Sequence, residues 1–307
     1  MTLTPSSSRE FVGAVVETSQ ASYDDASPRA TARAYPRWAR WSVALLGVAA
    51  ALGAALIATA TLVANDPPIT PPVLLRAFGI YVGLPAVAAC ALAGAFAASV
   101  TVRSGELIVE QAGRRTEIPL SAIARVRAWS LPLPSPGVEL ERGSGLPLGF
   151  ALALRDPTPL LGALDRAGVV GAREPLGGAL ARWSAARRAT APPTLVRRLL
   201  DFPVFALLPT ALLFNVHQQI SYGGLLGEYH LLGAGAWLGT LATYWATCTV
   251  YLVLWASAWR GLAELACYWI ARAAPARSEQ ARRAAERMCG IAYYAGVPLL
   301  LALRLLP

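Results

Sequence analysis

The chain has 307 residues, of which 55% are hydrophobic and only 15% are charged. Soluble domains usually carry about a quarter charged residues, so this composition favours an integral membrane protein. The formal net charge of +9 comes from 27 basic residues, all of them arginine. A basic soluble protein would suggest a nucleic-acid partner. Cytoplasmic loops of membrane proteins also collect arginine, so we expect no nucleic-acid binding.

The cysteines show neither a zinc motif nor a disulfide framework. All four lie in or beside apolar runs, without the Cys or His spacing of a zinc site. We therefore expect them to behave as small buried hydrophobic residues. They are Cys90, Cys248, Cys267 and Cys289.

Residues 1–40 are polar and lack apolar periodicity, which predicts a largely disordered cytoplasmic tail. Residues 41–102 predict a transmembrane helical hairpin. Its first span, Trp41–Ala64, has no charge for 24 residues, enough to cross a hydrocarbon core of roughly 30 Å. A proline-rich turn leads to the second span, Ala77–Val102, which Pro85 is expected to kink.

Residues 103–168 change to short alternating runs separated by glycine, serine and proline. The run VTVRSGELIVEQAG indicates two strands joined at Ser104-Gly105, and further strands are expected at Gly137–Arg142 and Leu148–Leu154. Pro157–Ala167 is expected to form a helix that closes a small antiparallel sheet or barrel. The apolar residues expected on the buried side are Ile118, Leu120, Ile123, Val126, Leu160, Leu161 and Leu164.

The segment GELIVEQAGRRTEIPLSAIARVRAW, followed by a short terminal helix, resembles the bacterial PH-like domains that are attached to membrane helices. The resemblance covers roughly residues 101–168. It implies a small split-sheet barrel that serves assembly or partner binding, and it does not imply phosphoinositide binding. The proline-rich interruption at Leu131–Gly137 departs from the strand order of that family.

Residues 169–198 predict a basic linker around an amphipathic helix at Glu174–Ala191. Such a helix suits anionic headgroups at the cytoplasmic leaflet. The alternative is a helix packed on the sheet domain, and the sequence does not separate the two. The arginines expected at the membrane surface are Arg182, Arg187, Arg188, Arg197 and Arg198.

Residues 199–307 predict a bundle of three further spans. They are Leu199–Val216, Leu231–Trp259 and Cys289–Leu303. The first and last are short for a span of about 20 residues, so they are the weaker of the three. Arg260 and Glu264 stand four apart on one helix and are expected to pair. The predicted fold is an α-helical integral membrane protein of about five transmembrane helices with an inserted, small β-rich (PH-like) cytoplasmic domain.

The distribution of arginine predicts the orientation. Of the arginines near predicted spans, 24 lie on one side and only Arg76 and Arg304 on the other. Cytoplasmic loops carry the excess of positive charge, so the N-terminus is expected inside and the C-terminus outside. The lack of lysine and the abundance of alanine are typical of a GC-rich genome. We therefore expect a multi-pass protein of a bacterial cytoplasmic (inner) membrane.

A polar outside loop is expected at residues 215–230, which hold the only two histidines of the chain. His217, Glu228 and His230 are the residue types of a two-histidine, one-carboxylate metal site. The competing interpretation is a structural interfacial loop, because histidine, glutamine and tyrosine tolerate half-wet surroundings. The candidate binding residues of this loop are Asn215, His217, Gln218, Tyr222, Glu228 and His230.

Three functions are compatible with these features. The first is a non-catalytic binding, assembly or regulatory membrane protein whose PH-like module engages a protein partner or a second copy of the chain. The second is a membrane-embedded metal- or haem-dependent enzyme or redox protein that uses the outside loop. The third is a transporter subunit, which would need ionisable groups deep in the bundle; the apolar spans argue against a proton-coupled pump. The only partner common to all three is the lipid bilayer.

Overall fold

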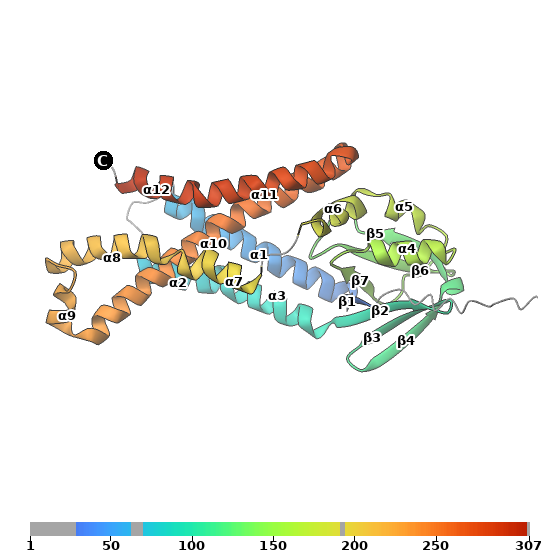
Figure 1. Ribbon diagram of the computed structural model, residues 1–307. Helices are drawn as coiled ribbons and strands as arrows, with labels where there is room; N and C mark the ends of the chain where they lie inside the picture. The colour runs from blue at the N-terminus through green and yellow to red at the C-terminus, as the bar shows by residue number, and fades with distance from the viewer. Residues whose placement is uncertain (1–28, 63–69, 191–193, 306–307) are drawn as a thin grey trace, which may run out of the picture.

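The computed structural model describes residues 29–62, 70–190 and 194–305 (Figure 1). A curled antiparallel sheet with short helices lies at one end, and long helices extend from it toward the other. Within the described residues, four helices are long and apolar enough to cross a membrane: Arg37–Thr61, Pro71–Ala95, Leu195–Tyr222 and Ala234–Ala273. The predicted combination of membrane-length helices with a β-rich domain is therefore present.

The sheet has seven strands in the order β4-β3-β2-β1-β7-β6-β5, and every neighbouring pair is antiparallel. The strands are β1 (Ala30–Tyr35), β2 (Ala97–Arg103), β3 (Glu106–Gln111), β4 (Arg114–Pro119), β5 (Ile123–Ala128), β6 (Gly137–Arg142) and β7 (Ala151–Leu154). A short 3₁₀ turn, η2 (Leu120–Ala122), joins β4 to β5. The two edge strands of the sheet are thus consecutive in the chain.

The central strand comes from a segment that the sequence did not predict. β1 lies between β2 and β7, with Ala30 opposite Val100 and Ala32 opposite Leu154. The prediction of a disordered tail is therefore wrong for residues 30–40, whereas residues 1–28 lie outside the described residues. A run of alanines with Thr31, Arg33 and Tyr35 between them carries a weak strand signal, and strands far away in sequence supply its hydrogen bonds.

Two membrane-length helices are continuous with two neighbouring strands of the sheet, β1 and β2. β1 ends at Tyr35, and α1 (Arg37–Leu62) begins after Pro36; α3 (Leu84–Ala95) ends one residue before β2. The second predicted span is therefore too long, because residues 97–102 are strand rather than helix. Residues 98–102, Ala-Ser-Val-Thr-Val, are apolar enough by hydropathy to extend the predicted span. Their β-branched side chains, however, favour a strand.

The second membrane-length helix is a single rod built from α2 (Pro71–Phe78), a π-helical turn η1 (Gly79–Gly83) and α3. Pro85 follows that turn and has no N–H to donate to the helix. The kink expected at this proline stays a prediction. α1 packs against this rod at Gly53, where a Cβ would overlap the carbonyl oxygen of Tyr81. Glycine is therefore what permits the close approach of the two helices.

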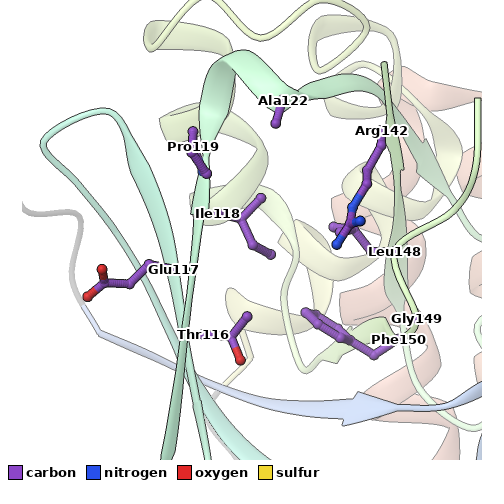
Figure 2. Close-up of a pocket in the computed structure, with 9 residues that line it drawn as sticks. All are labelled: Thr116, Glu117, Ile118, Pro119, Ala122, Arg142, Leu148, Gly149 and Phe150. Atoms are coloured by element: carbon purple, nitrogen blue, oxygen red, sulfur yellow. The ribbon is translucent and has the colours of Figure 1, made fainter. Parts of the chain in front are cut away.

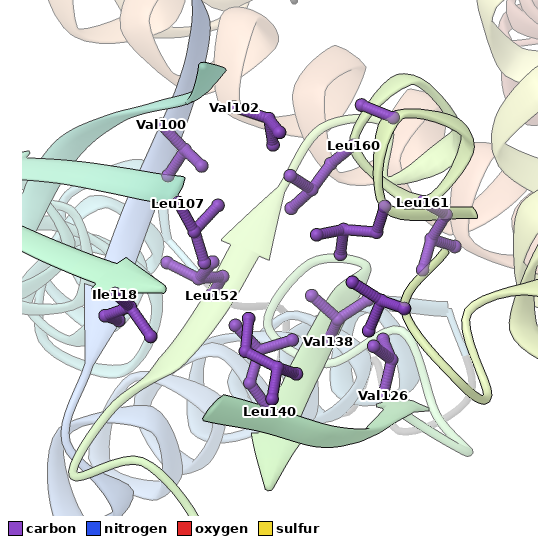
Figure 3. Packing of buried hydrophobic residues seen from close by; sticks show 14 of the residues in the cluster. Val100, Val102, Leu107, Ile118, Val126, Val138, Leu140, Leu152, Leu160 and Leu161 are labelled. Carbon is purple, nitrogen blue, oxygen red and sulfur yellow. The ribbon is translucent and has the colours of Figure 1, made fainter. Parts of the chain in front are cut away.

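The sheet domain has its own hydrophobic core, which Figure 3 shows between the concave face of the sheet and α4 (Thr158–Arg166). All seven residues predicted for the buried side lie in it, and each is at most 7% exposed. Because residues of both edge strands, such as Ile118 and Val126, share this one cluster, the sheet must curl around it. The strands predicted at Gly137–Arg142 and at the Ser104-Gly105 turn are also confirmed.

The predicted amphipathic helix at Glu174–Ala191 is two helices, α5 (Arg173–Leu176) and α6 (Ala179–Arg188), separated by Gly177-Gly178. Leu180 and Trp183 of α6 pack against Cys267 and Tyr268 of α10 (Ala234–Ala273). α6 thus lies between the sheet domain and the longest helix, where it connects the two.

The third membrane-length helix joins α7 (Leu195–Leu199), a π-helical segment η3 (Leu200–Val204) containing Pro203, and α8 (Leu207–Tyr222). It is longer than predicted at both ends.

The prediction of a polar loop at residues 215–230 is wrong over most of that range. Residues up to Tyr222 are helical, the connection is Gly223–Leu226, and α9 (Gly227–Leu232) follows. Polar side chains at the end of an apolar helix were misread as a loop.

α10 has 40 residues and therefore measures about 60 Å, twice the thickness of a hydrocarbon core. One half reaches the sheet domain, and there η4 (Pro275–Arg277) turns the chain into α11 (Ser278–Tyr294), which runs back along α10. The fifth predicted span falls on the end of α11 and on α12 (Gly296–Leu305), which meet at Ala295. Neither is among the four membrane-length helices, so the count of five is not supported.

Candidate functional sites

The residues predicted at the far-side loop lie on two short stretches of helix. Asn215, His217, Gln218 and Tyr222 occupy the last two turns of α8, and Glu228 and His230 lie on α9. Gly223, at φ +72°, ends α8 in the left-handed conformation that favours glycine. The chain then turns back within a few residues, through Gly223–Leu226.

A buried polar cluster forms at this end of the molecule. The Glu228 carboxylate accepts hydrogen bonds from Gln218 Nε2 at 2.5 Å and from Thr240 Oγ1 at 2.7 Å, and both Glu228 and Gln218 are buried. The Glu228 backbone N–H in turn donates to Gln218 Oε1. Because α8, α9 and α10 each supply one side chain, the cluster fastens three helices together.

The two histidines do not join Glu228. The His217 ring packs against Tyr222 and Tyr244 with its Nδ1 3.4 Å from Ser221 Oγ, and His230 is exposed beside Tyr229. Among the described residues, no three His, Cys, Asp or Glu side chains form a group that could hold a metal ion. The predicted metal site of His217, Glu228 and His230 is thus not assembled. The Glu228 carboxylate instead accepts hydrogen bonds from the Gln218 amide and the Thr240 hydroxyl.

Three of the arginines predicted at the membrane surface are engaged in ion pairs. Arg187 pairs with Glu264, Arg188 with Asp156 at 2.9 Å, and Arg197 with Asp201. The remaining two are Arg182 and Arg198, and the buried Nε of Arg182 has no hydrogen-bond partner within the described residues. Two of the three arginines of α6 are therefore paired with carboxylates of the same chain.

A charge cluster joins α6, α10 and α11 where the long helices reach the sheet domain. At its centre Arg282, only 4% exposed in its side chain, lies 2.8 Å from Glu264 and 2.7 Å from Glu286. The predicted pair of Arg260 and Glu264 is confirmed at 3.5 Å. Burial lowers the pKa of Arg187, the fifth member of the cluster, and Glu264 partly offsets this effect.

A second joint fastens α1 to the sheet. Arg40 lies 2.6 Å from Glu139 of β6, and its guanidinium lies over the Trp129 ring at 3.7 Å from the ring centre. A charged group stacked on an aromatic face and paired with a carboxylate is held in one place. Sequence reasoning missed this joint because its partners stand about ninety residues or more from Arg40.

The sheet domain carries a cavity of about 300 Å³ at a seam where the curled sheet does not close (Figure 2). We use "seam" for the gap between the free edge of β4 and the segment Leu148–Phe150. Residues of β4, the end of β6 and that segment line it: Thr116, Glu117, Ile118, Pro119, Ala122, Arg142, Leu148, Gly149 and Phe150. Ile118 and Leu148 are buried at its base, so the cavity opens from the hydrophobic core of the domain.

The polar groups at the seam are few and differ in their pairing. Figure 2 shows Thr116 and Ile118 pointing across the gap toward Phe150, whereas Glu117 points away. Glu117 pairs with Arg115 at 2.7 Å. In the described part of the chain, the Arg142 side chain makes neither an ion pair nor a hydrogen bond, and it reaches into the gap. The seam is therefore an apolar cavity with one uncompensated positive charge.

Sequence reasoning predicted the burial of Ile118 but not the seam itself. The width of the gap depends on the strand order, and that order depends on β1. No local signal marks Arg142, which is the last residue of a correctly predicted strand.

Comparison of the chain with known protein families, curated proteins and solved structures does not assign it to a family. No protein-family model matches the chain, and no curated protein or solved structure matches it. The resemblance to PH-like domains therefore remains a prediction, and the function has to be argued from the sites.

Proposed function

We propose that this chain is a non-catalytic, membrane-anchored binding or assembly protein whose sheet domain engages a protein partner at the seam. One observation carries the proposal. The sheet ends at β4 without a neighbour, and its free edge borders an open, largely apolar cavity. Unpaired strand edges are recognition surfaces, and natural proteins usually cover them.

The other edge of the sheet differs, which supports the choice of β4. α5 packs against β5, so helical structure covers that side. The groups that line the seam are apolar side chains, a hydroxyl, a paired carboxylate and one arginine. This set suits the binding of a partner rather than general acid–base or nucleophilic chemistry, which needs a positioned base beside a nucleophile.

The helices serve in this proposal as a rigid mount. The charge cluster ties α10 and α11 to α6, and Arg40 ties α1 to β6. A partner bound at the seam would thus be held at a fixed position relative to the membrane. We further propose a bacterial inner membrane with the sheet domain in the cytoplasm, on the basis of the arginine distribution.

Photo-crosslinking from two adjacent residues of β4 tests this function. Side chains alternate across a strand, so Thr116 faces the seam and Arg115 faces away. A benzoyl-phenylalanine at position 116 of the full chain, expressed in membranes, should crosslink to one defined protein that mass spectrometry identifies. The same group at position 115 should not. Crosslinks from both positions, or from neither, would contradict the proposal.

A further inference from the structure

We infer that the seam binds an extended peptide segment that carries an apolar residue and, two positions from it, an acidic residue, added as an eighth strand along β4. The inference rests on the proposed function and names the chemistry of its partner. It follows from three properties of the seam: a free backbone edge, an apolar cavity beside it and one unpaired guanidinium.

The backbone edge accounts for the extended conformation. β4 pairs along its whole length with β3, from Glu106 opposite Pro119 to Gln111 opposite Arg114, and its other side faces no strand. A peptide laid along that side can form main-chain hydrogen bonds in the ladder pattern of a sheet. Pro119 limits the ladder at one end because it has no N–H.

The cavity accounts for the apolar side chain. In a strand every second side chain points to the same face, so alternate residues of an added peptide would face the core of the domain. There Ile118, Leu148 and Phe150 form the wall. A volume of about 300 Å³ lies at the lower end of the range for binding pockets, which suits one or two aliphatic or aromatic side chains.

Arg142 accounts for the acidic residue. Glu117 is already paired with Arg115, so the net charge that an incoming ligand meets at the seam is that of Arg142. A guanidinium binds a carboxylate with two parallel hydrogen bonds, which gives both orientation and selectivity. A glutamate or aspartate two positions from the apolar residue points to the same face of the strand, so its carboxylate can reach Arg142 and fix the register of the peptide.

An amphiphilic lipid anion is the competing occupant, since an acyl chain and a carboxylate would also meet an apolar cavity and an arginine. We favour the peptide because four consecutive residues of β4, Thr116–Pro119, border the cavity. A fatty acid makes no use of a strand edge, whereas a peptide does.

The test uses the purified full chain in detergent and three fluorescein-labelled hexapeptides, in which glutamate stands two positions from valine, leucine or phenylalanine and the other positions are threonine. We expect saturable binding by fluorescence anisotropy for at least one of them. Arg142→Glu should weaken this binding at least tenfold, whereas the control Arg173→Glu, an exposed residue of α5 outside the cavity, should leave it unchanged. Peptides with lysine in place of glutamate should not bind.

A version of the binding peptide with methylated backbone nitrogens decides whether the strand edge takes part, because it cannot donate to a ladder. It should not bind. Equal binding of the methylated peptide, an unchanged affinity in R142E, or no binding of any hexapeptide would overturn the inference. So would displacement by oleate without any peptide binding, which would assign the seam to a lipid anion. If any of these outcomes occurred while position 116 still crosslinked to one defined protein, the proposed function would stand. Only the inference about the extended peptide would then be rejected.

Discussion

Arg282 holds two carboxylates from different helices, so its removal tests the charge cluster directly. Arg282→Met would remove the buried partner of Glu264 and Glu286 and leave them only the more exposed Arg260, with Arg187 beside Glu264. Breaking a buried ion pair costs about 3–5 kcal/mol, and we expect the lower end because both carboxylates are partly exposed. Thermal unfolding of the protein in detergent should shift downward by several degrees.

The neighbouring arginine provides the control for that substitution. Arg283 pairs with Glu279 at 3.3 Å, but both side chains are about two-thirds exposed. Exposed pairs contribute about 0–1 kcal/mol, so Arg283→Met should change the unfolding temperature little. Equal shifts for both variants would show that the buried cluster does not stabilise the joint.

Gln218 and His230 were both predicted as site residues, yet the structure gives them different roles. Gln218→Leu removes a buried donor from the Glu228 carboxylate, which should cost about 1–3 kcal/mol of stability. His230→Ala changes an exposed side chain and should cost less than about 0.5 kcal/mol. Chemical unfolding in detergent measures the difference. If His230→Ala instead removed a bound metal, as detected by elemental analysis, the structural role of the cluster would be the wrong explanation.

At the residue scale, the sequence predicted burial better than it predicted partners. The alternation of apolar and polar residues correctly predicted that Ile118 and Val126 are buried. This alternation can be read from a few neighbouring residues. The partner of Glu228 could not be predicted in the same way. Histidines nearby in sequence suggested a metal, whereas Gln218 and Thr240, ten and twelve residues away, make the bonds.

Among the helices, α1 and the α2–η1–α3 rod meet at one glycine, and this contact can be tested in isolation. Gly53→Ala would place a Cβ on the Tyr81 carbonyl and push the two helices apart. Overpacking of this kind costs about 1–3 kcal/mol. Gly47→Ala, on the same helix with no atom within 4 Å of its Cβ, should be neutral. Thermal unfolding of both variants measures the contrast, and a destabilised Gly47→Ala would assign the effect to the helix alone.

At the scale of elements, the errors of the sequence analysis share one cause. Residues 30–35 were assigned to a tail and residues 97–99 only to a span, yet they pair with each other in β1 and the first half of β2. Neither segment has a strong signal alone, and the hydrogen bonds that define them join residues about seventy positions apart. The hairpin that turns at Ser104-Gly105 was predicted, because its two strands lie next to each other in the chain.

For the whole molecule, the strand pair β1–β2 becomes the helix pair α1 and α3, so the sheet and the membrane hairpin form one continuous element. α6 and the charge cluster attach the long end of α10 to the same domain on another side. Two separate attachments resist rotation of the domain about either one. In the proposed function, this arrangement would hold the seam at a defined orientation to the membrane.

The orientation of the whole chain can be measured by cysteine labelling in intact cells. In a variant with the four native cysteines replaced by alanine, Gly224→Cys places a thiol in the connection between α8 and α9, and Ser144→Cys places one in an exposed turn of the sheet domain. α8 and α10 lead away from the sheet domain, so the two sites lie at opposite ends of the helices. With the arginine-rich side inside, a membrane-impermeant maleimide should label position 224 in intact bacterial spheroplasts. Position 144 should react only after permeabilisation. The reverse pattern would place the sheet domain outside, and labelling of both sites in intact cells would mean that the helices do not separate them.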